Sequence, residues 1–272
     1  MSWAIKAVTT ALSLAIISVA AGCDRPNPGT SRATAAASAS VAERGYAAPP
    51  AVIGVRRLGA GRLALSGSTS PAARVRLASP AGEAMFAAAD AQGVWRLVLP
   101  PAATVRLFGL SAQIQGRAVQ AEGYIAVTPS GDVIQLRAGS GAAAIQVRSA
   151  APRILAADFD RKGGAVISGT GPAAAALAVQ VDHGPPEPVR SDTDGRFMLA
   201  LNEPLGAGPH TIAVSGGAGR RAAIGLIVSQ AETPAPGPFR AAPVPGGWRV
   251  DWRTPGGGVQ STVLFDSGVG AS

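Results

Sequence analysis

The sequence predicts an all-β protein that contains two tandem β-sandwiches followed by a C-terminal β-hairpin. Three observations support this fold class. The 272 residues include 35 Gly and 22 Pro, residues that helix interiors reject and turns favour. Val, Ile and Leu recur in short alternating runs, which is the period of a β-strand. Finally, the chain resembles itself at a spacing of 102 residues, with Pro50 matching Pro152.

Residues 1–22 have the features of an export signal peptide: Lys6 near the start, and then a mostly apolar run over 7–21. That run is shorter than the ~20 residues that span a bilayer. Residues 19–23, VAAGC, resemble the lipobox of bacterial lipoproteins, although Ala20 stands where that motif usually has a leucine-like residue. The resemblance implies acylation of Cys23, the only cysteine of the chain. The alternative is an ordinary signal peptide with a cysteine nearby by chance.

Acylation at Cys23 would anchor the chain to the cell membrane, facing the periplasm. Asp24 follows directly and is similar to the signal that retains enteric lipoproteins in the inner membrane. That rule varies among bacteria, so the outer membrane stays open. Residues 23–49 are rich in Ala, Ser, Pro and Thr, a composition that predicts a flexible tether between the anchor and the folded part.

The two sandwich domains are predicted over residues 50–129 and 151–229. Alternation places Trp95, Leu97 and Leu99 on one strand face, and the second copy repeats this pattern. An Asp-x-x-Gly turn precedes each of these strands, because Asp bonds the backbone ahead of it and Gly takes positive φ. The matching pieces are LALSG (63–67) with AVISG (165–169) and DAQGVWRLVL (90–99) with DTDGRFMLAL (192–201).

These motifs are similar to those of bacterial Ig-like repeats, which combine a strand ending in Ser-Gly, a Pro-Ala loop, a Val-x-Leu strand and Asp-x-x-Gly before Trp or Phe. The resemblance implies seven-stranded sandwiches of an envelope or surface protein. Members of that family mostly space, display or bind. The chain departs from disulfide-bonded Ig domains because it has no cysteine pair.

Three segments lie outside the two repeats. Residues 130–150 predict a β-hairpin connector with a Gly-rich loop, which extends the first sheet or bridges the two domains. Residues 230–247 are Pro-rich and predict a stiff, extended linker. Residues 248–272 predict a Trp-rich hairpin whose apolar face carries Trp248 and Trp252. That face has to be covered, either by docking on an Ig-like domain or by a partner.

The predicted function is that of a non-enzymatic envelope protein, a structural adaptor or protein-binding module. Its partners would be the membrane, through the lipid anchor, and an envelope protein or anionic glycan. The alternative is a module that binds peptidoglycan or lipopolysaccharide, with Trp248 and Trp252 stacking on sugars and Arg249 and Arg253 pairing with anions. The net charge of +8 is spread over scattered arginines, a pattern that disfavours a nucleic-acid partner.

Catalytic and metal-binding signatures are lacking in the sequence. It contains no HExxH, GxSxG or P-loop motif, so we expect neither an enzyme nor a cofactor. His183 and His210 adjoin Gly and Pro and predict turn positions. Asp192 and Asp194 alternate as Ca²⁺ ligands do, but the first repeat has a single carboxylate at that turn, which favours a turn without metal. Asp158 and Asp160 are expected on a solvated face.

Overall fold

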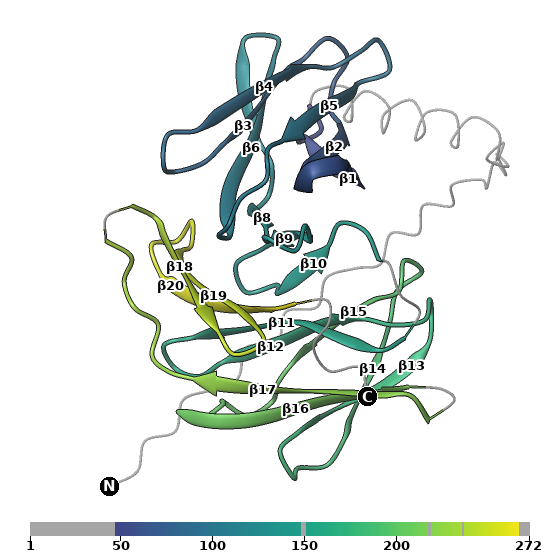
Figure 1. The fold of residues 1–272 in the computed structure, drawn as a ribbon, viewed down its shortest axis with the longest axis vertical. Helices are drawn as coiled ribbons and strands as arrows, with labels where there is room; N and C mark the ends of the chain where they lie inside the picture. The colour runs from purple at the N-terminus through teal and green to yellow at the C-terminus, as the bar shows by residue number, and fades with distance from the viewer. Residues whose placement is uncertain (1–46, 148–150, 217–218, 236, 267–272) are drawn as a thin grey trace, which may run out of the picture. The chain divides into compact units, whose positions relative to one another are not determined.

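The computed structural model describes residues 47–147, 151–216, 219–235 and 237–266, and these fold as strands with one short 3₁₀ turn at Gly59–Gly61. Residues Ala47–Ser272 form one compact unit (Figure 1). The expected signal peptide, Cys23 and the tether as far as residue 46 lie outside the described residues.

The first sandwich consists of two antiparallel sheets. One has the strand order β1-β2-β5, and the other contains β4-β3-β6-β8, with β7 paired to β6. Trp95, Leu97 and Leu99 all point into the core between the sheets, as the alternation predicts. The strands are β1 (Ala51–Arg57), β2 (Leu63–Ser68), β3 (Arg74–Ala78), β4 (Ala84–Ala88), β5 (Val94–Leu99), β6 (Arg106–Ile114), β7 (Arg117–Gln120) and β8 (Tyr124–Val127).

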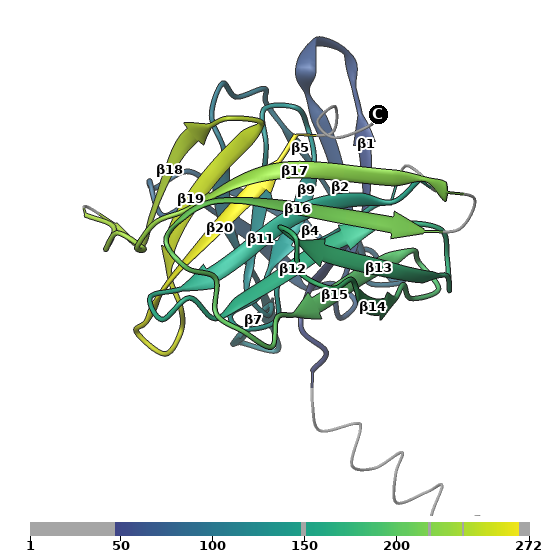
Figure 2. The same cartoon turned by 90° about the horizontal axis from the view of Figure 1, so that it is seen from below.

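The second sandwich repeats this order with β11-β12-β15 facing β14-β13-β16-β17, and Figure 2 shows the two layers one behind the other. Its core is built around Phe159, Ile167, Phe197 and Ile212. The strands are β11 (Arg153–Asp160), β12 (Ala165–Thr170), β13 (Ala176–Val181), β14 (Glu187–Arg190), β15 (Arg196–Ala200), β16 (Gly208–Gly216) and β17 (Arg221–Val228).

The spacing of 102 residues also relates the strands of the two copies. β2 and β12 match end to end at that spacing, and so do β6 and β16. Even the irregularity recurs, because the pairing register shifts between Val52 and Gly54 in one copy and between Ile154 and Ala156 in the other. The prediction of two tandem β-sandwiches is therefore confirmed.

The repeated motifs have direct physical causes. A Cβ on Gly67 would lie 2.2 Å from the Trp95 ring, and one on Gly169 would lie 2.3 Å from the Phe197 ring, so each glycine makes room for the aromatic residue on the neighbouring strand. The Asp90 carboxylate accepts the N–H groups of Gln92 and Val94, at 3.0 and 2.8 Å. Asp192 accepts the equivalent two N–H groups. Asp192 therefore acts as a turn residue, as predicted.

Each sandwich carries extra strands beyond the repeat. β9 (Val133–Leu136) pairs with β8 and β10 (Ala142–Ala144) pairs with β9, so the connector does form a hairpin and extends the first sheet. On the second sandwich, β18 (Phe239–Val244), β19 (Gly247–Arg253) and β20 (Val259–Phe265) continue the sheet outward from β11.

β18 corrects the expectation of a linker throughout 230–247. Pro243 lies in this strand, opposite Trp248. Proline is tolerated there because β18 is the outermost strand of its sheet, where a missing N–H can face away from the ladder.

We expect Gly67→Ala to destabilise the protein by about 2–3 kcal/mol, because the added methyl would overlap the Trp95 ring and the Ala51 carbonyl. Urea unfolding measures the change in the free energy of unfolding. Gly225→Ala is the matched control, since Gly225 is also in a strand but its Cβ position has no atom within 4 Å. Equal effects of the two substitutions would contradict this account of the Ser-Gly motif.

Candidate functional site: the C-terminal hairpin

The predicted site lies on β19 and β20, within a sheet of order β15-β12-β11-β20-β19-β18. The hairpin is therefore not isolated, since β20 pairs with β11 over residues 260–264. Trp248, Val250 and Trp252 share one face, as the alternation predicts, and belong to an apolar cluster with residues of both sandwiches. Val263 and Phe265 on β20 face the opposite way, into the core of the second sandwich.

Trp252 belongs to the cluster that joins the two sandwiches. Its side chain is fully buried, and its Nε1–H donates to Thr262 Oγ1 at 3.0 Å. Tyr124 of β8 meets the indole edge-to-face, with ring centroids 5.6 Å apart. The other buried members of the cluster are Val105, Leu107, Ala126, Ile134, Leu136, Ala142, Leu155, Ala156, Val250 and Leu264.

Arg249 extends from the other face of β19 and is fully engaged within the chain. Its Nε donates to Asp251 Oδ1 at 3.0 Å, and its Nη2 donates to the Gln230 carbonyl at 2.9 Å and to Ser261 Oγ at 3.0 Å. Ser229 accepts further hydrogen bonds from the same guanidinium. Ser261 Oγ–H donates to the nearly inaccessible Asp251 carboxylate. Arg249 therefore ties the segment after β17 to the hairpin.

The four predicted partner-binding residues thus have different environments. Trp252 has no exposed surface, Trp248 is half-buried against the same cluster, and Arg249 is satisfied internally. Only Arg253 is exposed. A sugar cannot stack on a ring that the protein already covers on both sides. The sequence pattern identified the apolar face of the hairpin correctly, but the structure covers it with the first sandwich.

Asp158 is a correction to the sequence-based expectation. We expected a solvated carboxylate, but Asp158 is only 2% exposed, because β20 lies beside β11 and covers it. Gln260 Nε2 and Thr262 Oγ1 donate to Asp158 Oδ1, and Oδ2 has no hydrogen-bond partner among the described residues. Burial raises the pKa of Asp158 from 3.8 to about 6, against the opposing effect of these two hydrogen bonds. The neighbouring Asp160 is exposed, as expected.

His210 locks two loops of the second sandwich together. Nδ1 lies 2.8 Å from Asp182 Oδ2 and Nε2 lies 2.8 Å from the Gly206 carbonyl, so both ring nitrogens face acceptors. The Asp182 hydrogen bond, supported by the one to Gly206, holds the pKa of His210 above its usual value. A hydrogen bond from the Thr211 N–H, followed by that of His210, lowers the pKa of Asp182. Sequence reading expected His210 in a turn, but it lies in β16, where it is paired with Leu226 of β17. The pair with Asp182 escaped prediction because the two residues are 28 positions apart.

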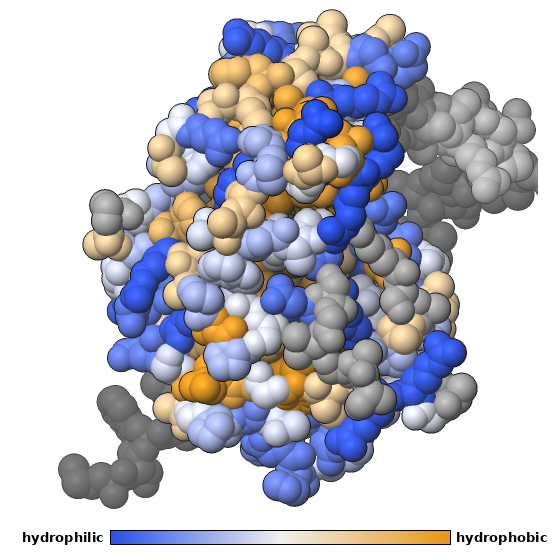
Figure 3. Space-filling view, viewed as in Figure 1, coloured by the Kyte–Doolittle hydropathy of each residue, from blue (hydrophilic) through white to orange (hydrophobic). Residues whose placement is uncertain are grey.

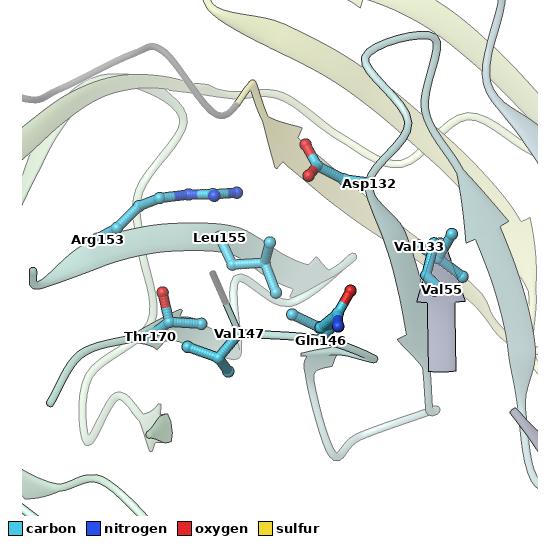
Figure 4. A pocket seen from close by; sticks show the side chains of 9 residues that line it. Val55, Asp132, Val133, Gln146, Val147, Arg153, Leu155 and Thr170 are labelled. Atoms are coloured by element: carbon cyan, nitrogen blue, oxygen red, sulfur yellow. The ribbon is translucent and has the colours of Figure 1, made fainter. Parts of the chain in front are cut away.

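The cavities among the described residues differ in volume and in lining. A cavity of about 20 Å³ lies between β1, β9, β11 and β12, and Figure 4 shows its lining side chains. This volume corresponds to about one water molecule. A larger groove of about 640 Å³ lies beside β17, but its polar side chains, including His210 and Arg249, already bond within the protein. On the face seen in Figure 3, hydrophobic residues form separate patches among hydrophilic ones.

Two further observations concern the part of the chain that the structure describes. No helix there has the length and apolar character needed to cross a membrane. Within the same residues, no group of three or more His, Cys, Asp or Glu is arranged to hold a metal ion.

Comparisons with known proteins add the following. No protein-family model matches the chain, and no curated protein matches it. Among solved structures, the chain is similar to one titled "Biofilm associated protein - BSP domain", at 14% identity over 63% of this chain and a TM-score of 0.24; the match spans 28% of that chain. It is also similar to one titled "Central Fibronectin-III array of RIM-binding protein", at 16% identity over 77% of this chain and 80% of that chain, with a TM-score of 0.24.

At a TM-score of 0.24 these two similarities carry no argument about function. The assignment of tandem β-sandwich domains rests on the strand order and the repeated register of the chain itself.

We expect Trp252→Ala to lower the free energy of unfolding by about 3–5 kcal/mol, because it removes the largest fully buried side chain of the cluster between the sandwiches. Arg253→Ala, at the exposed neighbour, should change it by no more than about 0.5 kcal/mol. Chemical unfolding followed by tryptophan fluorescence makes the measurement. Loss of ligand binding with unchanged stability in Trp252→Ala would instead indicate a binding role.

Asp158→Asn should stabilise the protein at pH 8 and change little at pH 4. The pKa of Asp158 is higher in the folded than in the unfolded state. Its contribution to the free energy of unfolding is therefore complete below about pH 4 and is lost as the pH rises through 6. A shift of this size corresponds to a gain on the order of 2–3 kcal/mol at pH 8. Thermal unfolding between pH 4 and 8 tests this, with Asp160→Asn at the exposed neighbour as control. A gain that is independent of pH would contradict the assignment.

Proposed function

We propose that this protein is a non-enzymatic, lipid-anchored component of the bacterial cell envelope that presents two tandem β-sandwiches as a structural adaptor or protein-binding module. Acyl chains on Cys23 hold one end at the membrane, on the periplasmic side. The residues after Cys23 act as a tether. Asp24 favours the inner membrane, and the outer membrane is the alternative. Positioning, rather than chemical transformation, is then the mechanism.

One observation carries the adaptor role: the apolar cluster around Trp252 joins the two sandwiches. Two domains that share a buried core move together, so a partner bound to one is held at a fixed place relative to the other. Trp252, Leu264 and Val250 come from the C-terminal hairpin, while Leu107 and Ile134 come from the first sandwich. The hairpin therefore serves as the joint between the domains.

The polar groups also support a non-enzymatic role. Nucleophilic catalysis needs a base that is free to accept a proton from a hydroxyl or thiol. His210 faces a carboxylate and a carbonyl with its two nitrogens, and Ser261 donates to Asp251. These groups are used to fix loops and strands. The glycan-binding alternative loses its main support, because Trp252 is buried and Arg249 is paired with Asp251.

Lipid attachment is tested by metabolic labelling with radioactive palmitate in a bacterium that expresses the full-length chain. We expect label on the wild type and none on Cys23→Ser, since the sulfur is the acyl acceptor. Ser38→Ala, a substitution in the same segment, is the control and should be labelled like the wild type. Recovery of wild-type protein in the soluble fraction with a free thiol would rule out the anchor.

A further inference from the structure

The two sandwiches differ on the outer face of the sheet that contains β3, β4 and β6 in one copy and β13, β14 and β16 in the other. In the first sandwich, Arg76 of β3 lies directly opposite Phe86 of β4. The same register position in the second sandwich pairs Ala178 with Pro188. A cationic and an aromatic side chain in the first copy therefore correspond to two residues that are neither.

The large side chains of this face in the first sandwich are accessible. Phe86 is 49% exposed, and Arg74 and Arg76 are exposed as well. The guanidinium carbon of Arg74 lies 4.5 Å from the centroid of the Phe86 ring. Among the described residues, neither arginine makes a hydrogen bond or an ion pair. Their N–H donors are therefore free for an anionic ligand.

The other side chains of this face are smaller and uncharged. Register places Ser111 of β6 opposite Arg76, and Gln113 opposite Arg74. The two arginines and Phe86 are thus the largest groups that the face offers to a partner. The remaining members, on the same side of their strands, are Ala84, Ala88, Gly109, Ala118 and Gln120.

Carboxylates do not neutralise these arginines. Residues 50–129 contain eight arginines and three acidic residues. Glu83 lies 3.7 Å from Arg106, and Glu122 lies 3.5 Å from another arginine. The Asp90 carboxylate accepts backbone N–H groups of its own turn. We therefore call the surface formed by Arg74, Arg76, Phe86 and their smaller neighbours the cationic face.

The equivalent face of the second sandwich lacks this character. Residues 151–229 contain seven basic and seven acidic residues. Two arginines do lie on the face, but each bonds within the domain. Arg190 donates to the Ala174 carbonyl at 2.7 Å, and Arg221 donates to Gln180 Oε1 at 3.4 Å. Unpaired guanidinium groups beside an exposed ring are thus a feature of the first copy of this face.

The cationic face begins at the end of the first sandwich where the tether enters. β1 starts at Ala51, which is paired with Ser68 at the end of β2. From Ser68 the chain crosses to the other sheet and begins β3 at Arg74, so Ala51 and Arg74 lie at the same end. The proposed tether, residues 23–46, would have a mean reach on the order of 30 Å. An anchor on Cys23 would therefore keep this end of the sandwich near the membrane.

We propose that the cationic face binds the surface of a membrane that contains anionic phospholipids. The guanidinium groups of Arg74 and Arg76 pair with lipid phosphates, and the Phe86 ring enters the boundary between headgroups and acyl chains. This inference rests on the proposed function for the nearness of the membrane. It deepens that function by naming the surface that lies against the bilayer. Because the two sandwiches share a buried cluster, the second sandwich is then also held in one orientation.

A soluble anionic polymer would be attracted by the same arginines, but the membrane is the favoured occupant. A chain that is anchored through a short tether meets the membrane surface in an intramolecular event, at an effective concentration that reaches about millimolar. A free ligand has no such advantage. The exposed Phe86 ring also gains from an apolar environment, which lipid acyl chains provide and a dissolved polyanion does not.

The test uses residues 47–272, the compact unit that holds all the described cores. This fragment lacks Cys23, so its result is independent of lipid attachment. It is sedimented with vesicles of phosphatidylcholine, or of phosphatidylcholine mixed with phosphatidylglycerol. We expect binding to the mixed vesicles only, and weaker binding at high salt, because salt screens exposed charges.

Charge reversal provides the matched variants. Arg74→Glu with Arg76→Glu should weaken binding to the mixed vesicles by at least about tenfold, since both phosphate contacts are lost. Arg190→Glu with Arg221→Glu makes the same change in net charge on the equivalent face of the second sandwich, and should leave binding near the wild-type value. All four side chains are exposed, so thermal unfolding should show that both variants remain folded.

A site-specific label tests where the membrane contacts the protein. Residues 47–272 contain no cysteine, so Phe86→Cys can carry a single polarity-sensitive dye. Pro188→Cys is the matched control, because Pro188 has the same register position in the second sandwich. On adding mixed vesicles, we expect the fluorescence of the dye to increase at position 86 and to stay unchanged at position 188.

Four results would overturn the proposal. The first is a lack of binding to the mixed vesicles, and the second is equal weakening by both pairs of substitutions. The third is binding without a fluorescence change at position 86. The fourth is binding of polygalacturonate that depends on Arg74 and Arg76 and is tighter than that of vesicles, which would assign the face to a glycan. Failure of palmitate labelling would leave these measurements unaffected, and failure of vesicle binding would leave the labelling result standing.

Discussion

The sheet β15-β12-β11-β20-β19-β18 carries apolar side chains on both faces, and the rest of the structure depends on this double burial. On one face, Phe159, Val263 and Phe265 complete the core of the second sandwich. On the other, Trp252 and Leu264 meet the first sandwich. A strand buried on both faces cannot leave its place without opening two cores, so β20 holds together the second domain and the joint between domains.

Double burial also explains where the polar groups of this sheet lie. Side chains that alternate with apolar ones must enter one of the two cores or their margins, and there they need partners. Asp251 finds Arg249 and Ser261. Asp158 Oδ1 accepts two hydrogen bonds from β20, and Oδ2 has no partner among the described residues. The raised pKa of Asp158 therefore follows from burial by β20 and not from any feature of β11 alone. Because the pKa of this buried carboxyl is raised, the free energy of unfolding is higher in mild acid than above pH 6.

The two copies of the repeat differ in what covers the outer face of their first two strands. In the second copy, the outer face of the first two strands receives the end of the first domain and becomes an internal surface. In the first copy, the equivalent face stays accessible among the described residues and is cationic.

Much of the fold was predictable from the amino-acid sequence alone, because its signals are local. Alternation places Trp95 and Phe197 in the cores, and Asp-x-x-Gly turns and the Ser-Gly strands set the register of each copy. The candidate site was predictable only in part, since alternation assigns Trp248 and Trp252 to one face but does not say what covers that face. Pro243 in β18 also escaped prediction, since only an edge position accommodates it.

Only the tertiary structure shows what covers the face with Trp248 and Trp252, and which partners the nearby charged side chains have. The burial of Trp252, the pairing of Asp158 with Gln260 and the link between His210 and Asp182 join residues 10 to 102 positions apart. Sequence periodicity extends over one strand at a time. It predicts which face of the strand a side chain occupies, but not which residue of another strand it contacts. Which sheets meet is fixed by the long-range packing of apolar surface, and that packing appears only when the whole chain is folded.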